Sequence, residues 1–166
     1  MRFDGEVWFD FSTPSVWVFY RWVRALAESG VSVNLSWIPR HTPDEQVAMA
    51  TFLGLQSHAA RGRYIHAMLG LIHIERESPA DRETVIRALV ATGCGAEELM
   101  EDHSDLVDLR ERAERLGVGA VPTLYRHGPV LSVQLNPAVL DGDPQAVARV
   151  INDMIVNDGI WELRKP

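Results

Sequence analysis

Two short apolar segments flank one amphipathic segment in the first forty residues, and this order constrains the fold more than any other feature of the chain. Residues 6–11 are rich in aromatic and β-branched side chains, which is typical of a buried strand. Residues 13–29 repeat apolar side chains at helical spacing, and residues 31–38 alternate as a second strand. Such a unit crosses over right-handed and leaves its strands parallel. The chain is therefore predicted to be an α/β protein.

Small polar residues precede proline at five places, and each pair is typical of a helix start. The polar side chain caps free N–H groups, and proline at the first helical position lacks only an N–H that the helix does not use. Thr42 with Glu45 also fits a capping box. The helix that follows is predicted to break at Arg61-Gly62-Arg63. The five pairs are Thr13-Pro14, Thr42-Pro43, Ser78-Pro79, Asn136-Pro137 and Asp143-Pro144.

Helices are predicted for the middle of the chain, residues 41–103, and strands resume only towards the C-terminus. Residues 117–126 are a glycine-punctuated approach to a strand. A turn at His127-Gly128-Pro129 joins this strand to another over 130–135, which predicts a β-hairpin. A last helix is expected from Asp143-Pro144 to about Asn157. No internal repeat or linker interrupts this plan, so one domain is expected over all 166 residues.

Charge and composition argue against several classes of function. Sixteen basic and twenty-three acidic side chains give a net charge of −7, which repels nucleic acids and anionic membranes. No apolar run approaches the roughly 20 residues that span a bilayer. Asp4, Glu6 and Asp10 make the first residues unlike a secretory signal. Cys94 is the only cysteine, so no disulfide forms within the chain. We therefore expect a cytoplasmic protein that binds neither nucleic acid nor membrane.

Two motifs far apart in the chain resemble the thioredoxin superfamily. Thr13-Pro14-Ser15-Val16 follows the first strand, and Val121-Pro122-Thr123 precedes the third. The helical block between them is similar to that of the DsbA branch, whose members carry Cys-Pro-x-Cys at the first motif and a cis-proline at the second. The resemblance implies a thioredoxin-like fold with an inserted helical subdomain. The thioredoxin core would span about 1–40 and 104–166, and the helical insert about 41–103.

Within this branch, the chain most resembles the actinobacterial mycothiol-dependent nitroreductases. The similar residues are Trp8-Phe9-Asp10, Pro14, Trp17, Arg21-Trp22, Gly128-Pro129-Val130-Leu131-Ser132 and Glu162-Leu163-Arg164. A second similarity, carried by Asp10-Phe11-Ser12-Thr13-Pro14, is to the 2-hydroxychromene-2-carboxylate isomerases and the kappa-class glutathione transferases. These resemblances imply a low-molecular-weight thiol, either mycothiol or glutathione, as the cofactor.

The first motif has lost the groups that exchange disulfides. Thr13 and Val16 stand where the family has cysteines, and no adjacent base is evident that would activate the threonine hydroxyl. A helix N-terminus still attracts an anion, including a bound thiolate. In the glutathione-using relatives a serine at the position of Thr13 donates to such a thiolate, and the residue before the cis-proline, here Val121, pairs with the ligand. The resemblance thus implies a thiol-dependent isomerase or transferase that adds a bound thiolate to an electrophile.

Thr13 is the candidate catalytic residue under this interpretation. Trp17 is included among the ligand-binding candidates because it lies one turn into the helix, and His41 because relatives place substrate-facing loops after the second strand. The candidates for ligand binding are Ser12, Pro14, Ser15, Trp17, His41, Val121 and Pro122.

Other interpretations remain open at this point. Thr13 also fits a plain helix cap, since it is one of five similar helix starts. The whole chain also fits a non-catalytic binding or scaffold protein that recognises a peptide or protein, and a dimer, with itself or with an active paralogue, stays open. No metal site is expected. His58, His66 and His73 would share a helix face only if the helix ran unbroken through Arg61-Gly62-Arg63.

Overall fold

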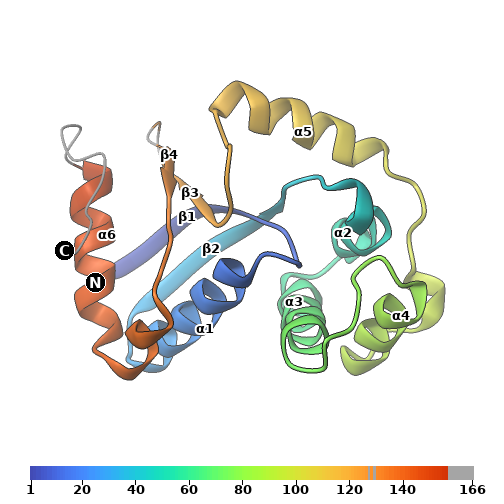
Figure 1. Ribbon diagram of the computed structural model, residues 1–166, viewed down its shortest axis with the longest axis horizontal. Helices are drawn as coiled ribbons and strands as arrows, with labels where there is room; N and C mark the ends of the chain where they lie inside the picture. The colour runs from blue at the N-terminus through green and yellow to red at the C-terminus, as the bar shows by residue number, and fades with distance from the viewer. Residues whose placement is uncertain (127, 129, 157–166) are drawn as a thin grey trace.

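A single mixed sheet forms the centre of the computed structural model, which describes residues 1–126, 128 and 130–156 (Figure 1). The described strands lie in the order β2-β1-β3-β4. β1 (Arg2–Phe9) pairs in parallel with β2 (Ser32–Pro39), as the crossover predicts. On its other side β1 pairs antiparallel with β3 (Thr123–Tyr125), which pairs antiparallel with β4 (Val130–Ser132). The predicted hairpin is confirmed, although its turn residues His127 and Pro129 lie outside the described residues.

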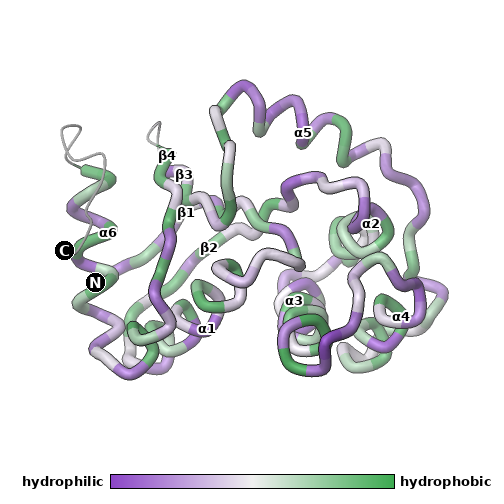
Figure 2. The backbone as a smooth tube through the Cα atoms, in the orientation of Figure 1, coloured by the Kyte–Doolittle hydropathy of each residue, from purple (hydrophilic) through white to green (hydrophobic). Residues whose placement is uncertain are grey.

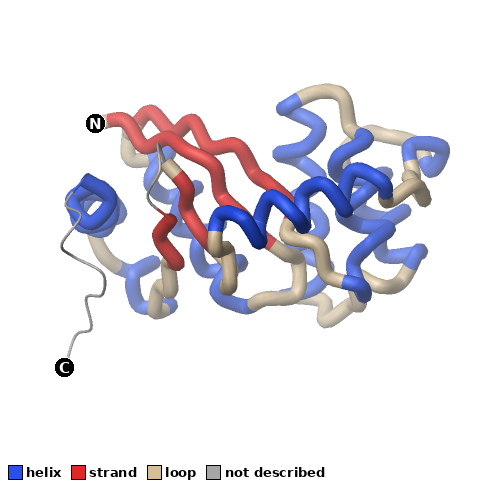
Figure 3. The backbone as a smooth tube through the Cα atoms, turned by 90° about the horizontal axis from the view of Figure 1, so that it is seen from above, coloured by secondary structure: helices blue, strands red, loops and turns tan. Residues whose placement is uncertain are grey.

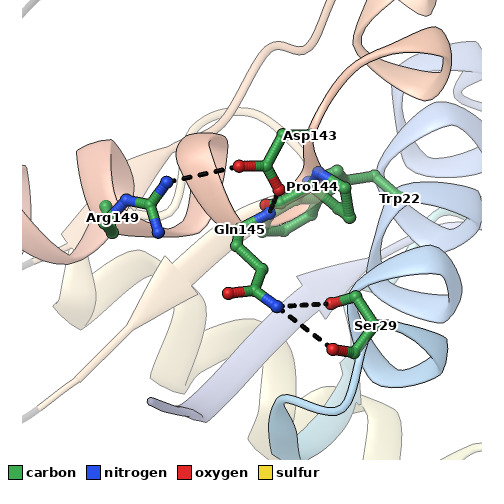
Figure 4. Close-up of polar contacts among 6 residues, drawn as sticks. All are labelled: Trp22, Ser29, Asp143, Pro144, Gln145 and Arg149. Carbon is green, nitrogen blue, oxygen red and sulfur yellow. Dashed lines mark hydrogen bonds and ion pairs between the residues drawn. The ribbon is translucent and has the colours of Figure 1, made fainter.

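Helix α1 (Pro14–Glu28) packs against one face of the sheet and is joined to α6 (Pro144–Val156). The indole Nε1 of Trp22 donates to the Pro144 carbonyl at 3.2 Å, and the Gln145 amide donates to the Ser29 carbonyl at 3.1 Å (Figure 4). A short 3-10 helix, η3 (Pro137–Asp141), precedes α6. The start of the last helix is where the sequence predicts it.

Helix α5 (Ser104–Leu116) crosses the opposite face of the sheet (Figures 1 and 3). Most of its length is hydrophilic (Figure 2), and only Leu106 and Ala113 are buried. Arg112 fixes it to β1, because its guanidinium lies 2.6 Å from a Glu6 carboxylate oxygen and 5.4 Å from the centroid of the Trp8 ring.

The helical insert lies beside the end of the sheet (Figure 1). Its elements are η1 (Pro43–Glu45), α2 (Gln46–Gly54), α3 (His58–His73), α4 (Arg82–Ala91) and η2 (Ala96–Glu98). Figure 2 shows hydrophobic segments of α2, α3 and α4 gathered in this part of the molecule, where they form a core of their own.

The predicted helix break at Arg61-Gly62-Arg63 is wrong. The chain breaks earlier, at Leu55-Gln56-Ser57, where the Ser57 hydroxyl accepts from the Ala60 N–H at 3.0 Å and caps α3. The Arg61 side chain supplies hydrogen-bond donors to the carbonyls at the end of α2, those of Leu53 at 2.7 Å and Leu55 at 2.8 Å. Residues 61–63 therefore lie inside α3, and His58, His66 and His73 share one unbroken helix.

Side-chain caps appear at only some of the predicted helix starts. Asn136 accepts from the Ala138 N–H, and Asp143 accepts from the Gln145 N–H, both at 2.9 Å. The start predicted at Ser78-Pro79 is wrong, because α4 begins three residues later with Asp81 as its cap. Thr42 and Glu45 form no capping box, and the Glu45 side chain points elsewhere.

Two hydrophobic clusters meet at β1 and α1. The sheet cluster joins the sheet to α1 and α6 and contains Phe3, Trp22, Leu35, Leu124 and Ile151. The insert cluster joins the far end of β1 to the insert and contains Phe9, Phe11, Phe52, Tyr64 and Leu89. The segment after β1, residues 10–13, emerges where these clusters meet, and its polar groups form the candidate site.

Candidate functional site

The two sequence motifs meet in space, as the resemblance implies. The Val121–Pro122 peptide bond is cis, and the Ser15 hydroxyl donates to the Val121 carbonyl at 3.1 Å. Ser15 lies in the first turn of α1, so this bond ties the start of that helix to the segment before β3. Thr13, Ser15, Val121 and Pro122 therefore belong to one site.

Thr13 does not cap α1. Its side chain makes no capping hydrogen bond among the described residues, and the hydroxyl instead donates to Asp10 Oδ2 at 2.8 Å. The Thr13 N–H donates to the other carboxylate oxygen, Oδ1, also at 2.8 Å. Asp10 is 5% exposed, so its carboxylate is held almost entirely by the protein. The sequence-based expectation that no base adjoins Thr13 is therefore wrong.

Glu45 binds the same segment from the start of the insert. Its Oε2 accepts from the Phe11 N–H at 2.8 Å, and its Oε1 accepts from the Ser12 N–H at 3.0 Å and from the Ser12 hydroxyl. Burial raises the pKa of Glu45, the nearby Asp10 raises it further, and the bonds from Ser12 and Phe11 oppose the shift. Two buried carboxylates thus surround residues 11–13.

His73, at the end of α3, holds the segment from another side. Its Nε2–H donates to the Phe11 carbonyl at 2.8 Å, and its ring stacks on Trp17 with the centroids 5.9 Å apart and the planes 8° apart. Burial and the charge of Arg76 lower the pKa of His73, while the Phe11 bond and Asp10 oppose this. Trp17 is half-buried, and its assignment to the ligand site stays a prediction.

His41 is not joined to this group. Its Nε2 accepts from the Gln46 amide at 3.1 Å, and burial, followed by the charges of Arg110 and His103, lowers its pKa. No hydrogen bond in the described part of the chain links His41 to Thr13 or Val121. Its assignment to the ligand site stays a prediction.

The Asp10 carboxylate already accepts the Thr13 hydrogen bond that a bound thiolate was expected to accept. Asp10 takes both the N–H and the hydroxyl hydrogen of Thr13, so the hydroxyl oxygen keeps only its lone pairs for a ligand. Asp10 and Glu45 also make the site unfavourable for a further buried negative charge. The geometry therefore suits a ligand that donates a hydrogen bond, such as a neutral thiol, better than a preformed thiolate.

Three residues that sequence reasoning missed, Asp10, Glu45 and His73, build most of this site. Glu45 was interpreted as part of a capping box and Asp10 as part of a strand. His73 was considered only as a possible metal ligand together with His58 and His66. The Glu45 and His73 contacts exist only once the insert is folded against the end of β1, whereas Asp10 is only three residues from Thr13 and could have been noticed as a local partner.

A shallow polar depression of about 390 Å³ lies elsewhere, on the face of the sheet that α5 leaves open. Arg2 and Arg126 line it and both pair with Asp4, at 2.8 and 2.7 Å. It contains none of the predicted site residues.

Metal-ligand side chains do not cluster in the part of the chain that the structure describes, where no group of three or more His, Cys, Asp or Glu residues could hold an ion. No described helix is both long and apolar enough to cross a bilayer. Cys94 lies beyond the end of α4 and is half-buried.

Comparisons with known proteins agree with this architecture. No protein-family model matches the chain, and no curated protein is significantly similar to it. Solved structures do match. The DsbA of Pseudomonas aeruginosa shares 18% identity at a TM-score of 0.64, covering 92% of this chain and 82% of that one. A protein of Nitrosomonas europaea assigned as a disulfide isomerase shares 10% identity at a TM-score of 0.68, with 94% and 100% covered.

A third match is the reduced form of DsbL, with 12% identity, a TM-score of 0.56, and 93% and 90% of the two chains covered. At these identities the likeness concerns the fold. Together with the observed strand order, the cis Val121–Pro122 bond and the helices inserted between β2 and β3, it shows that the chain has a thioredoxin-like fold with the helical insertion seen in DsbA structures.

Proposed function

We propose that this DsbA-like protein binds a low-molecular-weight thiol between Thr13 and Val121, and uses it as a thiol-dependent isomerase or transferase. One cysteine cannot form the dithiol that disulfide exchange within a chain requires. The observation that carries the proposal is the Thr13 hydroxyl, which is held 2.8 Å from the buried Asp10 carboxylate beside the cis-proline segment.

The chemistry follows from the direction of this hydrogen bond. The Thr13 oxygen accepts from the ligand S–H while its own hydrogen points to Asp10. As the sulfur bonds to an electrophilic carbon, such as that of an α,β-unsaturated carbonyl, the S–H proton becomes acidic. It passes through the Thr13 hydroxyl to Asp10, which acts as a general base. The electron pair released onto the substrate then takes a proton from Asp10, so that atoms and charge balance.

Thiol binding is tested by calorimetric titration with mycothiol, glutathione and coenzyme A. Saturable binding of one of them to the wild type, weakened in Thr13→Val and retained in Thr13→Ser, supports the proposal. The transferase step is tested by the loss of an enone absorbance with the bound thiol, which Asp10→Asn should slow by roughly 100-fold or more. A well-folded wild type that binds none of the three thiols overturns the proposal.

A non-catalytic binding protein is the second candidate, and one observation favours it. The hydroxyls of Ser12, Thr13 and Ser15 all donate within the protein, to Glu45, Asp10 and Val121 respectively. A peptide or protein partner would then meet a surface whose donors are already used. The choice of mycothiol over glutathione, a cytoplasmic location and a homodimer stay predictions.

A further inference from the structure

Both polar backbone groups of Phe11 are held by side chains of the helical insert. Glu45 accepts the Phe11 N–H at 2.8 Å, and His73 donates to the Phe11 carbonyl at 2.8 Å. Glu45 comes from the first turn of the insert, and His73 comes from the end of α3. Phe11 itself lies in the segment between β1 and α1, which belongs to the thioredoxin core. Its backbone therefore depends on the insert for its hydrogen bonds.

The Phe11 side chain is anchored in the same way. It is fully buried, and its ring packs edge-on against Tyr64 of α3, with the centroids 6.0 Å apart. A similar contact of 5.3 Å joins it to Phe9 at the end of β1. Phe11 thus enters the insert cluster, and a shift of α3 relative to β1 would move it.

Glu45 and His73, which together clamp the Phe11 backbone, also contact residues that follow Phe11 in the chain. The second oxygen of Glu45 accepts from the N–H and the hydroxyl of Ser12, the residue directly before Thr13. The His73 ring stacks on Trp17, within α1. One side chain therefore fixes the approach to Thr13, and the other fixes the insert against the helix that Thr13 precedes.

We propose that Glu45 and His73 are positioning residues through which the helical insert sets the geometry of Ser12 and Thr13, and with it the affinity of the site. The ligand is the thiol of the proposed function, so this proposal rests on that function. As a carboxylate, Glu45 accepts charge-assisted hydrogen bonds from all three of its donors. Protonation removes that charge and weakens the bonds from the Phe11 and Ser12 N–H groups, so the clamp that Glu45 and His73 form on Phe11 loosens.

The titratable groups around the clamp are few among the described residues. Asp10 belongs to the segment that Glu45 binds, and its charge acts on both Glu45 and His73. Arg76, after α3, acts on His73. Burial raises the pKa of Glu45 above 4.5, so the carboxylate takes its proton at a less acidic pH than an exposed one. The affinity of the wild type is therefore expected to fall as the pH drops through the Glu45 pKa.

Glu45→Gln tests this with Glu97→Gln, an exposed position in η2, as the matched control. A glutamine offers only one acceptor oxygen. We expect the Kd for the bound thiol at pH 7.5 to rise roughly fivefold or more in Glu45→Gln. The pH dependence of binding between pH 7.5 and 5 should also be reduced, and Glu97→Gln should match the wild type in both respects.

His73 is tested by a second matched pair. His73→Gln keeps a donor for the Phe11 carbonyl and should bind the thiol within about twofold of the wild type. His73→Phe keeps a ring beside Trp17 but has no donor, and should weaken binding by roughly fivefold. Circular dichroism confirms that each variant is folded. Equal affinity of Glu45→Gln, His73→Phe and the wild type would overturn the proposal.

Amide chemical shifts separate failure of the clamp from failure of the proposed function. In ¹⁵N-labelled protein without ligand, the resonances of Thr13 and Ser15 should move in Glu45→Gln and titrate with pH in the wild type. Neither residue bonds Glu45 directly. If the wild type binds no thiol but these amides respond, the proposed function is wrong and the clamp stands. If they do not move, the clamp is wrong.

Discussion

Thr13 differs from Asn136 and Asp143, which also precede a proline at a helix start, in the direction of its side chain. The Asn136 and Asp143 side chains point towards the helix that follows and accept one of its N–H groups. The Thr13 side chain points back to the preceding segment and donates to Asp10, although a threonine is a common cap. The difference arises because a buried carboxylate in the preceding segment needs donors, and the Thr13 N–H and hydroxyl supply two.

Replacing Thr13 by valine should therefore cost more than the loss of an ordinary cap. Valine keeps the shape but leaves one oxygen of the buried Asp10 without its hydroxyl partner. Because that hydrogen bond is charge-assisted, we expect the free energy of unfolding to fall by about 1.5–3 kcal/mol. Urea denaturation at pH 7 measures this. Thr13→Ser keeps the hydroxyl and should stay close to the wild type, whereas equal stability of all three proteins would contradict the role assigned to Asp10.

His73 should make the protein less stable in mild acid. Its pKa lies below the ordinary value of 6.5 in the folded protein, mainly because it is buried. Its contribution to stability is thus fully present above pH 6.5 and is lost as the pH falls through the folded pKa. The pKa values of His41 and His66 are lowered as well, and act in the same direction.

Urea denaturation at several pH values between 7.5 and 5 tests this assignment. His73→Gln should show a smaller loss of stability over this range than the wild type, because one of the histidines that take up a proton on unfolding is gone. The ring resonances of His73 should titrate below pH 6.5 in the folded protein and return to about 6.5 in urea. An unchanged pH dependence in His73→Gln would show that the ring is not responsible.

At the scale of elements, alanine substitutions at two glycines, one in a helix and one in a strand, test the backbone conformation of α3 and β1. Gly62 is exposed within α3, and a Cβ added there meets nothing within 4 Å. Gly62→Ala should stabilise the protein by about 0.5–1 kcal/mol, since alanine favours the helix. Gly5 in β1 has φ +137°, and a Cβ there would lie 2.9 Å from the Tyr125 carbonyl oxygen. Gly5→Ala should therefore destabilise it by about 1–3 kcal/mol. A destabilising Gly62→Ala would mean that α3 breaks after all.

The order of the elements could be predicted from the sequence, because it depends on neighbours along the chain. Thr13-Pro14 and Asp143-Pro144 predict helix starts from the local sequence alone, and helices begin at both prolines. The break at Gly62 was wrong because Arg61 satisfies the carbonyls of α2 from within the next helix. The Glu45 interaction was missed because its partner Phe11 is 34 residues away, while a capping-box partner is three residues away. The Glu45 and His73 parts of the site are thus built from contacts that local patterns do not contain, and only the Asp10–Thr13 contact is local.

At the scale of the whole molecule, β1 and α1 make the two clusters one folding unit. Phe3 and Val7 belong to the sheet cluster, and Phe9 at the other end of β1 belongs to the insert cluster. Loss of the insert would leave Phe9 and Phe11 without their partners. The sheet and the insert are therefore expected to unfold together.

Leu89→Ala tests this coupling from a distance, because Leu89 is fully buried in α4. The cavity should lower the free energy of unfolding by about 2–5 kcal/mol. Far-UV circular dichroism and tryptophan fluorescence, to which Trp22 of the sheet cluster and Trp8 of the insert cluster both contribute, should show one coincident transition in the wild type and in the variant. Two separate transitions, with the insert unfolding first, would show that the clusters are independent.

The central place of β1 also determines when the protein can finish folding during its synthesis. β1 leaves the ribosome before its antiparallel partner β3, which follows more than a hundred residues later. At about 5–20 residues per second, one edge of β1 waits several seconds or longer for its partner. Unpaired strand edges are the usual templates for aggregation. The nascent chain therefore passes through a stage in which β1 can pair with β2 while the edge of β1 that later pairs with β3 is still open to other chains.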